Sequence, residues 1–237
     1  MKAIILNSGV GKRLYPLTKN NPKCLTRING NTILGHQLEN ILHFGIDRFI
    51  ITTGPFEGKI KNFIKVKFPH LNVEYIKNNK YKTSNIIYSV WLTKGLIDDD
   101  IIIMHGDLVF DKNLLGKILN EKYYNCALID NIVVPPKKDF KVLIQDGIIK
   151  KIGVNVFDEN AYFLAPLYKF SKDSFNLWLN EIEKYVEKGE INIYAEEALN
   201  NLTDSVKIHP IYYHKEFCSE IDTIEDLQNV LLHLKND

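Results

Sequence analysis

Cysteine is scarce in this chain, and its three copies stand far apart. Cys24, Cys126 and Cys218 form no CxxC pair. A disulfide framework and a cysteine-based zinc site are both disfavoured, because each needs cysteines at paired spacings. Isolated thiols are typical of a reducing compartment, so we expect a cytoplasmic protein without disulfide bonds.

Long apolar runs and an excess of charge are also missing. No run approaches the roughly 18 apolar residues of a membrane-spanning helix, and the N-terminal stretch MKAIILN is too short for the apolar region of a signal peptide. The formal net charge is only +1 at pH 7. We therefore expect neither a membrane nor a nucleic acid as a partner, and the oligomeric state stays open.

Short apolar runs alternate with amphipathic segments in the first half of the chain, which is typical of a mostly parallel sheet covered by helices. The expected strands cover residues 3–6, 49–53, 72–76 and 101–105, and the expected helices cover 33–44, 59–66, 84–93 and 113–119. Later in the chain we expect a hairpin of 142–144 and 148–152, a strand over 161–170, and helices over 175–186 and from a Thr223 cap to 234. The 237 residues contain no repeat or linker, so we predict one α/β domain. Its open, Rossmann-like sheet is flanked by helices, and a smaller mixed β region follows.

The most informative stretch is residues 6–25, LNSGVGKRLYPLTKNNPKCL, which follows the first apolar strand. Its glycines let backbone N–H groups approach a phosphate chain, and its prolines stiffen the loop. Lys12, Arg13 and Lys23 can neutralise the phosphates. The chain has only three arginines, so Arg13 in this loop favours bidentate phosphate binding over a plain surface position.

Two common phosphate loops are excluded. The GxxxxGK[ST] loop would need glycine at Leu6 and serine or threonine at Arg13. The dinucleotide motif GxGxxG would need glycine at Leu14 and an acidic residue after the second strand, where residues 52–54 read Thr-Thr-Gly.

The stretch resembles the signature LxxGxGxRLxPLTxxxPKxL of the nucleotidyltransferase superfamily that makes nucleoside-diphosphate sugars and CDP-alcohols. The matching residues are Leu6, Gly9, Gly11, Arg13, Leu14, Pro16, Leu17, Thr18, Pro22, Lys23 and Leu25. The resemblance implies that Lys23 contacts the α-phosphate and Arg13 the β- and γ-phosphates. It also implies nucleotide binding by Leu6, Asn7, Gly9, Gly11 and Lys12, although Lys12 alternatively faces solvent. Residues 1–120 would form the nucleotide-binding half of the single domain 1–237, and residues 121–237 the acceptor-binding half.

This chain departs from the family where two alanines usually precede the first glycine. Asn7 and Ser8 occupy those positions here. The departure would alter contacts near the base or the ribose, whereas the positions that handle phosphate are intact.

Two carboxylates are candidate metal ligands. Asp107 follows an apolar strand in IIIMHGDLVFD, at the strand end where open sheets bind ligands. The later stretch SEIDTIEDL resembles the family's DIDTPEDL and puts Asp222 in the second ligand position. Asp222 also suits a helix N-cap, and Glu220 is the alternative ligand. Carboxylates suit Mg²⁺, which the resemblance implies as the cofactor.

Residues 78–89 carry amides and hydroxyls that are able to read a base edge. They resemble the segment N-x-x-Y-x-x-[ST]-N-x-x-S of choline-phosphate and related cytidylyltransferases. The matching residues are Asn78, Tyr81, Ser84 and Asn85, with Tyr88 and Ser89 at the end. We predict nucleotide contacts for Asn78, Ser84 and Asn85, against the alternative of a loop with a helix cap.

The acceptor side lacks a lysine that the resemblance leads us to expect. In the family's DGxVxxIxEKP segment a lysine binds the sugar phosphate, and Asn155 stands at that position here. Lys151, or else Lys150, is the candidate substitute. Glu196, on an expected helix over 192–199, is the candidate for an amine-bearing acceptor, with an exposed helix face for Glu196 and Glu197 as the alternative.

Together these patterns predict a Mg²⁺-dependent cytidylyltransferase. CTP and a small phosphorylated acceptor, similar to phosphocholine, a phosphonate or a phospho-amino acid, would give a CMP-linked product and pyrophosphate. Such enzymes often serve capsule or other surface-polysaccharide biosynthesis. The alternatives are a sugar-1-phosphate nucleotidyltransferase that uses UTP, dTTP or GTP, and a non-catalytic regulatory domain of the same fold.

Overall fold

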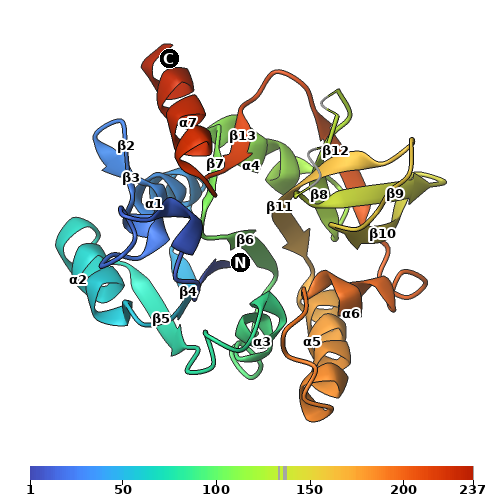
Figure 1. Cartoon of the computed structure of the whole chain (residues 1–237). Coiled ribbons are helices and arrows are strands. Elements are labelled where there is room, and N and C mark those ends of the chain that lie inside the picture. Colours follow the sequence, from blue (N-terminus) through green and yellow to red (C-terminus); the bar gives the residue numbers. More distant parts are fainter. Residues whose placement is uncertain (133, 136–137, 237) are drawn as a thin grey trace.

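The computed structural model describes residues 1–132, 134–135 and 138–236. Its central element is a nine-stranded sheet with the order β10-β9-β11-β6-β1-β4-β5, in which β8 pairs with β11 and β12 pairs with β8 (Figure 1). One sheet therefore runs through both halves of the chain. The α/β fold that the sequence predicted, with helices against the sheet and a smaller β region, is confirmed.

The first half of the sheet is parallel. Its strands are β1 (Lys2–Asn7), β4 (Arg48–Thr53), β5 (Asn72–Lys77) and β6 (Ile101–His105). β1 pairs with β4 on one side and with β6 on the other. β1, β4 and β6 are largely buried because both faces of the sheet are covered there, whereas the edge strand β5 is only half-buried. All four were expected from the sequence, and their carboxyl ends share one edge of the sheet.

The second half of the sheet is largely antiparallel. Its strands are β8 (Cys126–Asp130), β9 (Lys141–Gln145), β10 (Ile148–Gly153), β11 (Tyr162–Phe170) and β12 (His209–Tyr213). β11 runs antiparallel to β6 and joins the two halves. The hairpin β9–β10 is confirmed, and Asp146 and Gly147 turn it with φ angles of 50° and 70°. β8 and β12 were not expected, because their short apolar runs do not distinguish a strand from a helix.

Seven α-helices lie in the described part of the chain, and several begin at polar caps. Their bounds are α1 (Ile33–His43), α2 (Glu57–Lys67), α3 (Ile86–Trp91), α4 (Lys112–Asn120), α5 (Lys172–Glu187), α6 (Glu196–Asn200) and α7 (Ile224–Asn236). Thr32 caps α1 by accepting a 3.0 Å hydrogen bond from Gly35 N. Asn85 caps α3 by accepting a 2.7 Å hydrogen bond from Ile86 N, so this helix begins two residues later than expected. Within the described residues, no helix is both long enough and apolar enough to cross a membrane.

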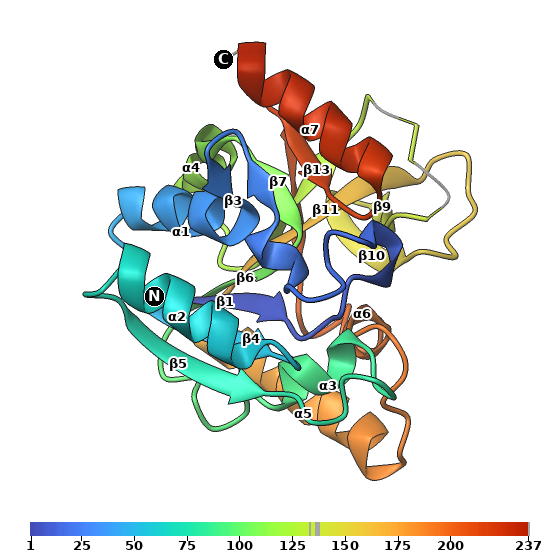
Figure 2. The same ribbon diagram turned by 60° about the vertical axis from the view of Figure 1, so that its left-hand side comes forward.

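Short elements surround the end of β1. They are the 3-10 helices η1 (Lys12–Leu14) and η2 (Lys23–Leu25) and the strands β2 (Arg27–Ile28), β3 (Asn31–Thr32), β7 (Leu108–Phe110) and β13 (Cys218–Glu220). β13 pairs antiparallel with β7, which places Glu220 opposite Leu108. In Figure 2 the dark-blue loop after β1 lies between α7 above and α3 below. Residues near both ends of the chain thus meet at the edge where β1 and β6 end.

Candidate active site

A cavity of about 520 Å³ opens at the carboxyl ends of β1 and β6. Its lining includes every residue predicted for the nucleotide, for catalysis and for the metal: Leu6, Asn7, Gly9, Gly11, Lys12, Arg13, Lys23, Asn78, Ser84, Asn85, Asp107 and Asp222. Lys151 and Glu196, predicted for the acceptor, do not line it. Segments far apart in the sequence therefore form one site.

The glycine loop folds back on itself at Gly11. This glycine has a left-handed φ of 63°, and its carbonyl accepts a 2.6 Å hydrogen bond from Thr18 Oγ1. A Cβ on Gly11 would lie 3.1 Å from Lys23 Cβ, which is tighter than ordinary contact. Glycine is thus required here both for the turn and for the close approach of Lys23.

Lys23 is the centre of a charged cluster. Its Nζ lies 2.5 Å from Asp107 Oδ2 and 2.6 Å from Asp222 Oδ1, and Arg13 Nη2 lies 2.9 Å from the same Asp222 oxygen. Burial opposes the charge of Lys23, but the two carboxylates outweigh it and raise the pKa of Lys23. Burial likewise opposes ionisation of Asp107, but Lys23 and His105 hold the pKa of Asp107 below its usual value. Lys23 and Asp107 are therefore both ionised at neutral pH.

The side chain of Asp222 does not cap α7. Thr223 does so instead: its Oγ1 accepts a 3.2 Å hydrogen bond from Asp226 N, and the Asp226 carboxylate accepts from the backbone N–H groups of Asp222 and Thr223. This reciprocal arrangement fixes the backbone of Asp222. The carboxylate of Asp222 is left to contact Lys23 and Arg13.

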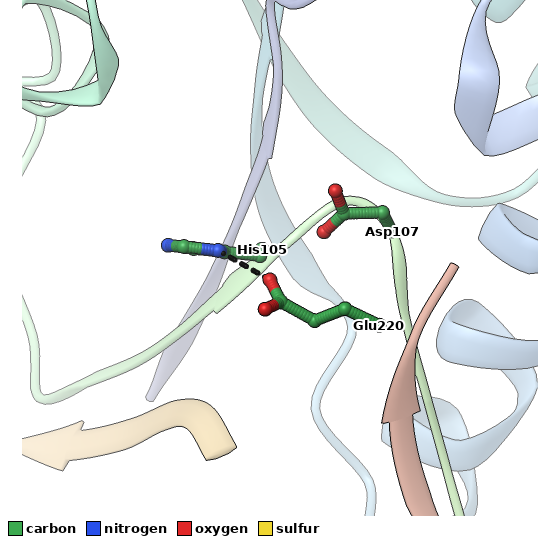
Figure 3. Close-up of side chains that lie close together, drawn as sticks. All are labelled: His105, Asp107 and Glu220. Atoms are coloured by element: carbon green, nitrogen blue, oxygen red, sulfur yellow. Dashed lines mark hydrogen bonds and ion pairs between the residues drawn. The ribbon is translucent and has the colours of Figure 1, made fainter. Parts of the chain in front are cut away.

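His105 and Glu220 form a second charged group beside Asp107 (Figure 3). His105 Nδ1 lies 2.9 Å from Glu220 Oε1, and ligand atoms of all three residues lie within 4.8 Å of one another. Burial opposes the charge of His105, but the hydrogen bond and charge of Glu220 raise the pKa of His105 to about 9. The imidazole is then protonated at neutral pH and forms an ion pair with Glu220. No sequence pattern indicated this pair, because the pairing of β13 with β7 creates it.

The carboxylates of the cavity suit a hard cation. Asp107 Oδ1 is buried and has no hydrogen-bond partner among the described residues. A buried carboxylate oxygen without a donor is costly unless it meets a cation or water. Asp107 and Asp222 therefore fit the Mg²⁺ ion that the sequence predicted.

Asn78 is held by protein groups. It is 1% exposed, and its Nδ2 donates to Ser84 Oγ at 3.1 Å and to Ser89 Oγ at 3.0 Å. Its Oδ1 accepts from Lys80 N at 2.8 Å. Both donor hydrogens are used, so the amide has none left for a base. Asn78 organises the segment, and Ser84 is the hydroxyl that lies half-buried at the cavity.

Gly106 follows β6 and lies so close to β1 that we expect only glycine to fit there. Gly106 N donates to Leu6 O at 3.1 Å, and a Cβ would lie 1.8 Å from Asn7 Oδ1 and 2.7 Å from Leu6 O. We expect Gly106→Ala to lower the free energy of unfolding by about 3 kcal/mol, as measured by urea denaturation. Gly58→Ala is the matched control. It lies in α2 with nothing within 4 Å of its Cβ, so it should raise stability by about 0.5 kcal/mol. Equal effects at both positions would contradict the expectation.

The two residues predicted for the acceptor lie elsewhere. Lys151 is exposed on β10. Glu196 is only 2% exposed and accepts a 3.0 Å hydrogen bond from Tyr168 Oη, and burial raises the pKa of Glu196. An exposed helix face is correct for Glu197 and wrong for Glu196, because α6 turns Glu196 inward beside the buried Ala195 and Leu199.

The structure adds cavity-lining residues that the sequence did not indicate. Lys138 lines the cavity, and its Nζ lies 2.9 Å from Asp226 Oδ2. Phe140 and Tyr194 line it too, with ring centroids 4.9 Å apart in an edge-to-face arrangement. Lys138 lies in a loop without a recognisable motif, so the sequence did not indicate it. Its ion pair with Asp226, near the start of α7, holds it at the cavity.

Comparison with known proteins agrees with this site. The family model described as nucleotidyl transferase matches residues 2–146. The chain belongs to the nucleotidyl transferase family. The predicted nucleotidyltransferase is therefore confirmed at the level of the family.

Individual relatives include cytidylyltransferases. The chain is 26% identical to a CTP:phosphoglutamine cytidylyltransferase of Campylobacter jejuni, with 96% of this chain and 98% of that protein covered. It is also 26% identical to the choline-phosphate cytidylyltransferase of Streptococcus pneumoniae over the full length of both chains. A solved structure of the S. pneumoniae enzyme superposes with a TM-score of 0.82 at 22% identity, covering 98% of each chain. The likeness to cytidylyltransferases that residues 78–89 indicated is confirmed.

One further relative is a longer, bifunctional protein. The bifunctional protein GlmU of Methanococcus maripaludis is 29% identical over 218 residues, which cover 89% of this chain and 49% of that protein. The chain therefore spans about half the length of this relative.

Proposed function

We propose that the chain transfers CMP from CTP to a small phosphorylated acceptor and releases pyrophosphate. The observation that carries the proposal is the Lys23–Asp107–Asp222 cluster in the same cavity as Ser84 and Asn85. The cytidylyltransferase relatives support the choice of CTP. A CMP-linked product of this kind would serve the decoration of surface polysaccharides.

The reaction needs positioning and charge neutralisation. An oxygen of the acceptor phosphate attacks the α-phosphorus of CTP, a new P–O bond forms, and the bond to the β-phosphate oxygen breaks. That acceptor oxygen is already anionic at neutral pH, so no general base is needed. Lys23 would neutralise the α-phosphate and Arg13 the departing pyrophosphate. Asp107 and Asp222 would hold Mg²⁺, which supplies further neutralisation of phosphate charge.

The acceptor end of the cavity combines a cation with aromatic groups. Lys138 can meet a phosphate, and the Phe140–Tyr194 pair provides aromatic faces. Aromatic faces attract an ammonium group. A small acceptor with a phosphate or phosphonate at one end and an amino or ammonium group at the other fits this pattern better than a sugar phosphate does. Asn155, in place of the family's lysine, agrees with that choice.

A lysine exchange tests the acceptor end. We expect Lys138→Met to raise the KM for the acceptor about tenfold while the KM for CTP stays within a factor of about two, since one charge-assisted hydrogen bond is lost. Lys151→Met is the comparison, because Lys151 is exposed outside the cavity. Steady-state kinetics measure both constants. A larger effect of Lys151→Met would reverse the assignment.

Pyrophosphate release tests the proposed function. The protein is incubated with Mg²⁺, each of the four NTPs in turn, and a panel of phosphocholine, phosphonates, phospho-amino acids and sugar 1-phosphates. Turnover with CTP and a non-sugar acceptor supports the proposal. Turnover with sugar 1-phosphates alone supports the alternative nucleotidyltransferase, and none with any pair supports a non-catalytic domain.

A further inference from the structure

A line of buried hydrogen bonds connects the end of β1 to the residues before α3. Ser8 Oγ donates to Thr52 Oγ1 at 3.1 Å, Ser89 Oγ donates to Ser8 Oγ at 3.0 Å, and Asn78 Nδ2 donates to Ser89 Oγ at 3.0 Å. Ser8 is 8% exposed, and the other three are at most 3% exposed. We call these four residues the hydroxyl relay.

Backbone groups contact both ends of the hydroxyl relay, and the one at Asn78 orients its amide. Asn78 Oδ1 accepts from Lys80 N, which orients the amide so that its NH₂ group faces Ser89. At the other end Thr52 Oγ1 also accepts from Asn7 N at 3.1 Å. A backbone N–H can only donate, so the Asn78 amide cannot flip without losing the hydrogen bond from Lys80 N.

The fixed amide also decides the role of Ser84. The second hydrogen of Asn78 Nδ2 goes to Ser84 Oγ, and Ser84 Oγ donates its own hydrogen to Lys80 O at 2.9 Å. A hydroxyl has one hydrogen and two lone pairs. Ser84 therefore offers one lone pair and no hydrogen toward the cavity that it lines.

We propose that the hydroxyl relay selects the base by making Ser84 a hydrogen-bond acceptor. This inference rests on the proposed function. The 4-amino group of cytosine can donate a hydrogen bond to such an acceptor. The 4-carbonyl oxygen of uracil is itself an acceptor, so the two oxygens would repel each other. Ser8, Ser89 and Asn78 are thus positioning residues, and they act on the base through Ser84.

Nucleotide binding without acceptor tests the inference. Isothermal titration in Mg²⁺ measures the dissociation constants of CTP and UTP, and their ratio is the CTP preference. We expect Ser84→Ala to lower this preference about tenfold or more, because a discriminating hydrogen bond is lost. Ser89→Ala and Ser8→Ala should each lower it roughly threefold to tenfold, the loss expected when one hydrogen bond of the relay is missing.

A double variant separates positioning from general structural support. If the relay acts through Ser84, the preference of Ser84→Ala/Ser89→Ala equals that of Ser84→Ala alone. Thr83→Val is the matched control, because the Thr83 hydroxyl also donates to Lys80 O, at 3.3 Å, but does not line the cavity. Its preference should equal that of the wild type.

The outcomes distinguish a failure of the proposed function from a failure of the hydroxyl relay. A wild type that does not prefer CTP contradicts the proposed function. A wild-type preference that survives in Ser89→Ala and Ser8→Ala, or additive losses in the double variant, overturns the relay and leaves the proposed function standing. Circular dichroism checks the fold of each variant, and Ser8→Ala probes the same relay if Ser89→Ala does not fold.

Discussion

Lys23→Met is expected to lower kcat by about three orders of magnitude while the chain stays folded. Removing a single group that stabilises developing charge typically costs a factor of about 10²–10³, and cationic groups at phosphoryl centres reach higher values. Lys23 Nζ is the one cation that contacts both Asp107 and Asp222 among the described residues, so no neighbour replaces it. Pyrophosphate release under saturating substrates measures the effect.

The same variant changes the electrostatics of the site. Without the ammonium group, Asp107 loses its closest counter-charge, and Asp222 keeps only the contact with the largely exposed Arg13. Repulsion between two close carboxylates raises their pKa values. We therefore expect the unfolding free energy to fall at neutral pH and to recover in part as the pH is lowered.

Lys19→Met is the matched control for Lys23→Met. Lys19 lies in the same loop, is exposed and does not line the cavity. Its turnover should match that of the wild type. Near wild-type turnover of Lys23→Met would rule out the assigned role of the residue, and equal losses in both variants would point to the loop as a whole.

The site residues that could be predicted from the sequence are those positioned by nearby residues in the chain. The loop from Gly9 to Lys23 and the strand ahead of Asp107 each depend on neighbours within a few residues, so spacing alone indicated them. Gly11 shows why: its left-handed turn and its contact with Lys23 both arise within one loop.

Other parts depend on pairings between distant segments. His105 meets Glu220 only because β13 pairs with β7, and Lys138 reaches the cavity through its ion pair with Asp226. No short window of sequence contains both members of either pair. Lys151 was predicted for the acceptor from its strand, but strand alternation alone did not tell which side faces the cavity.

The hydroxyl relay shows the same limit within a recognised motif. The resemblance indicated Asn78 and Ser84 as base contacts, but Ser8 and Thr52 joined them only when β1, β4 and α3 were placed together. A departure from the family at Ser8 thus has a physical partner, Ser89, that lies 81 positions later in the chain.

Asp107→Asn is expected to reduce both metal affinity and turnover, each by about two orders of magnitude or more. Asparagine keeps the shape of the side chain but removes the charge, and hard divalent ions depend on anionic oxygens. Titration with Mn²⁺, followed by electron paramagnetic resonance, measures the affinity without any turnover. Asp204→Asn, whose side chain is fully exposed and 3.9 Å from its nearest cation, is the control and should change neither quantity.

The second ligand can be assigned by comparing Asp222→Asn with Glu220→Gln. His105 lies 2.9 Å from Glu220, and a pKa of about 9 keeps this imidazole protonated at neutral pH. A protonated imidazole is no ligand, and it neutralises the carboxylate that it contacts. Asp222, in contrast, shares Lys23 with Asp107, so a cation that replaces the ammonium group meets both carboxylates. We therefore expect Asp222→Asn to weaken Mn²⁺ binding at least about tenfold more than Glu220→Gln does. A larger effect of Glu220→Gln would contradict this assignment. It would place the metal between Asp107 and Glu220, where His105 would have to lose its proton.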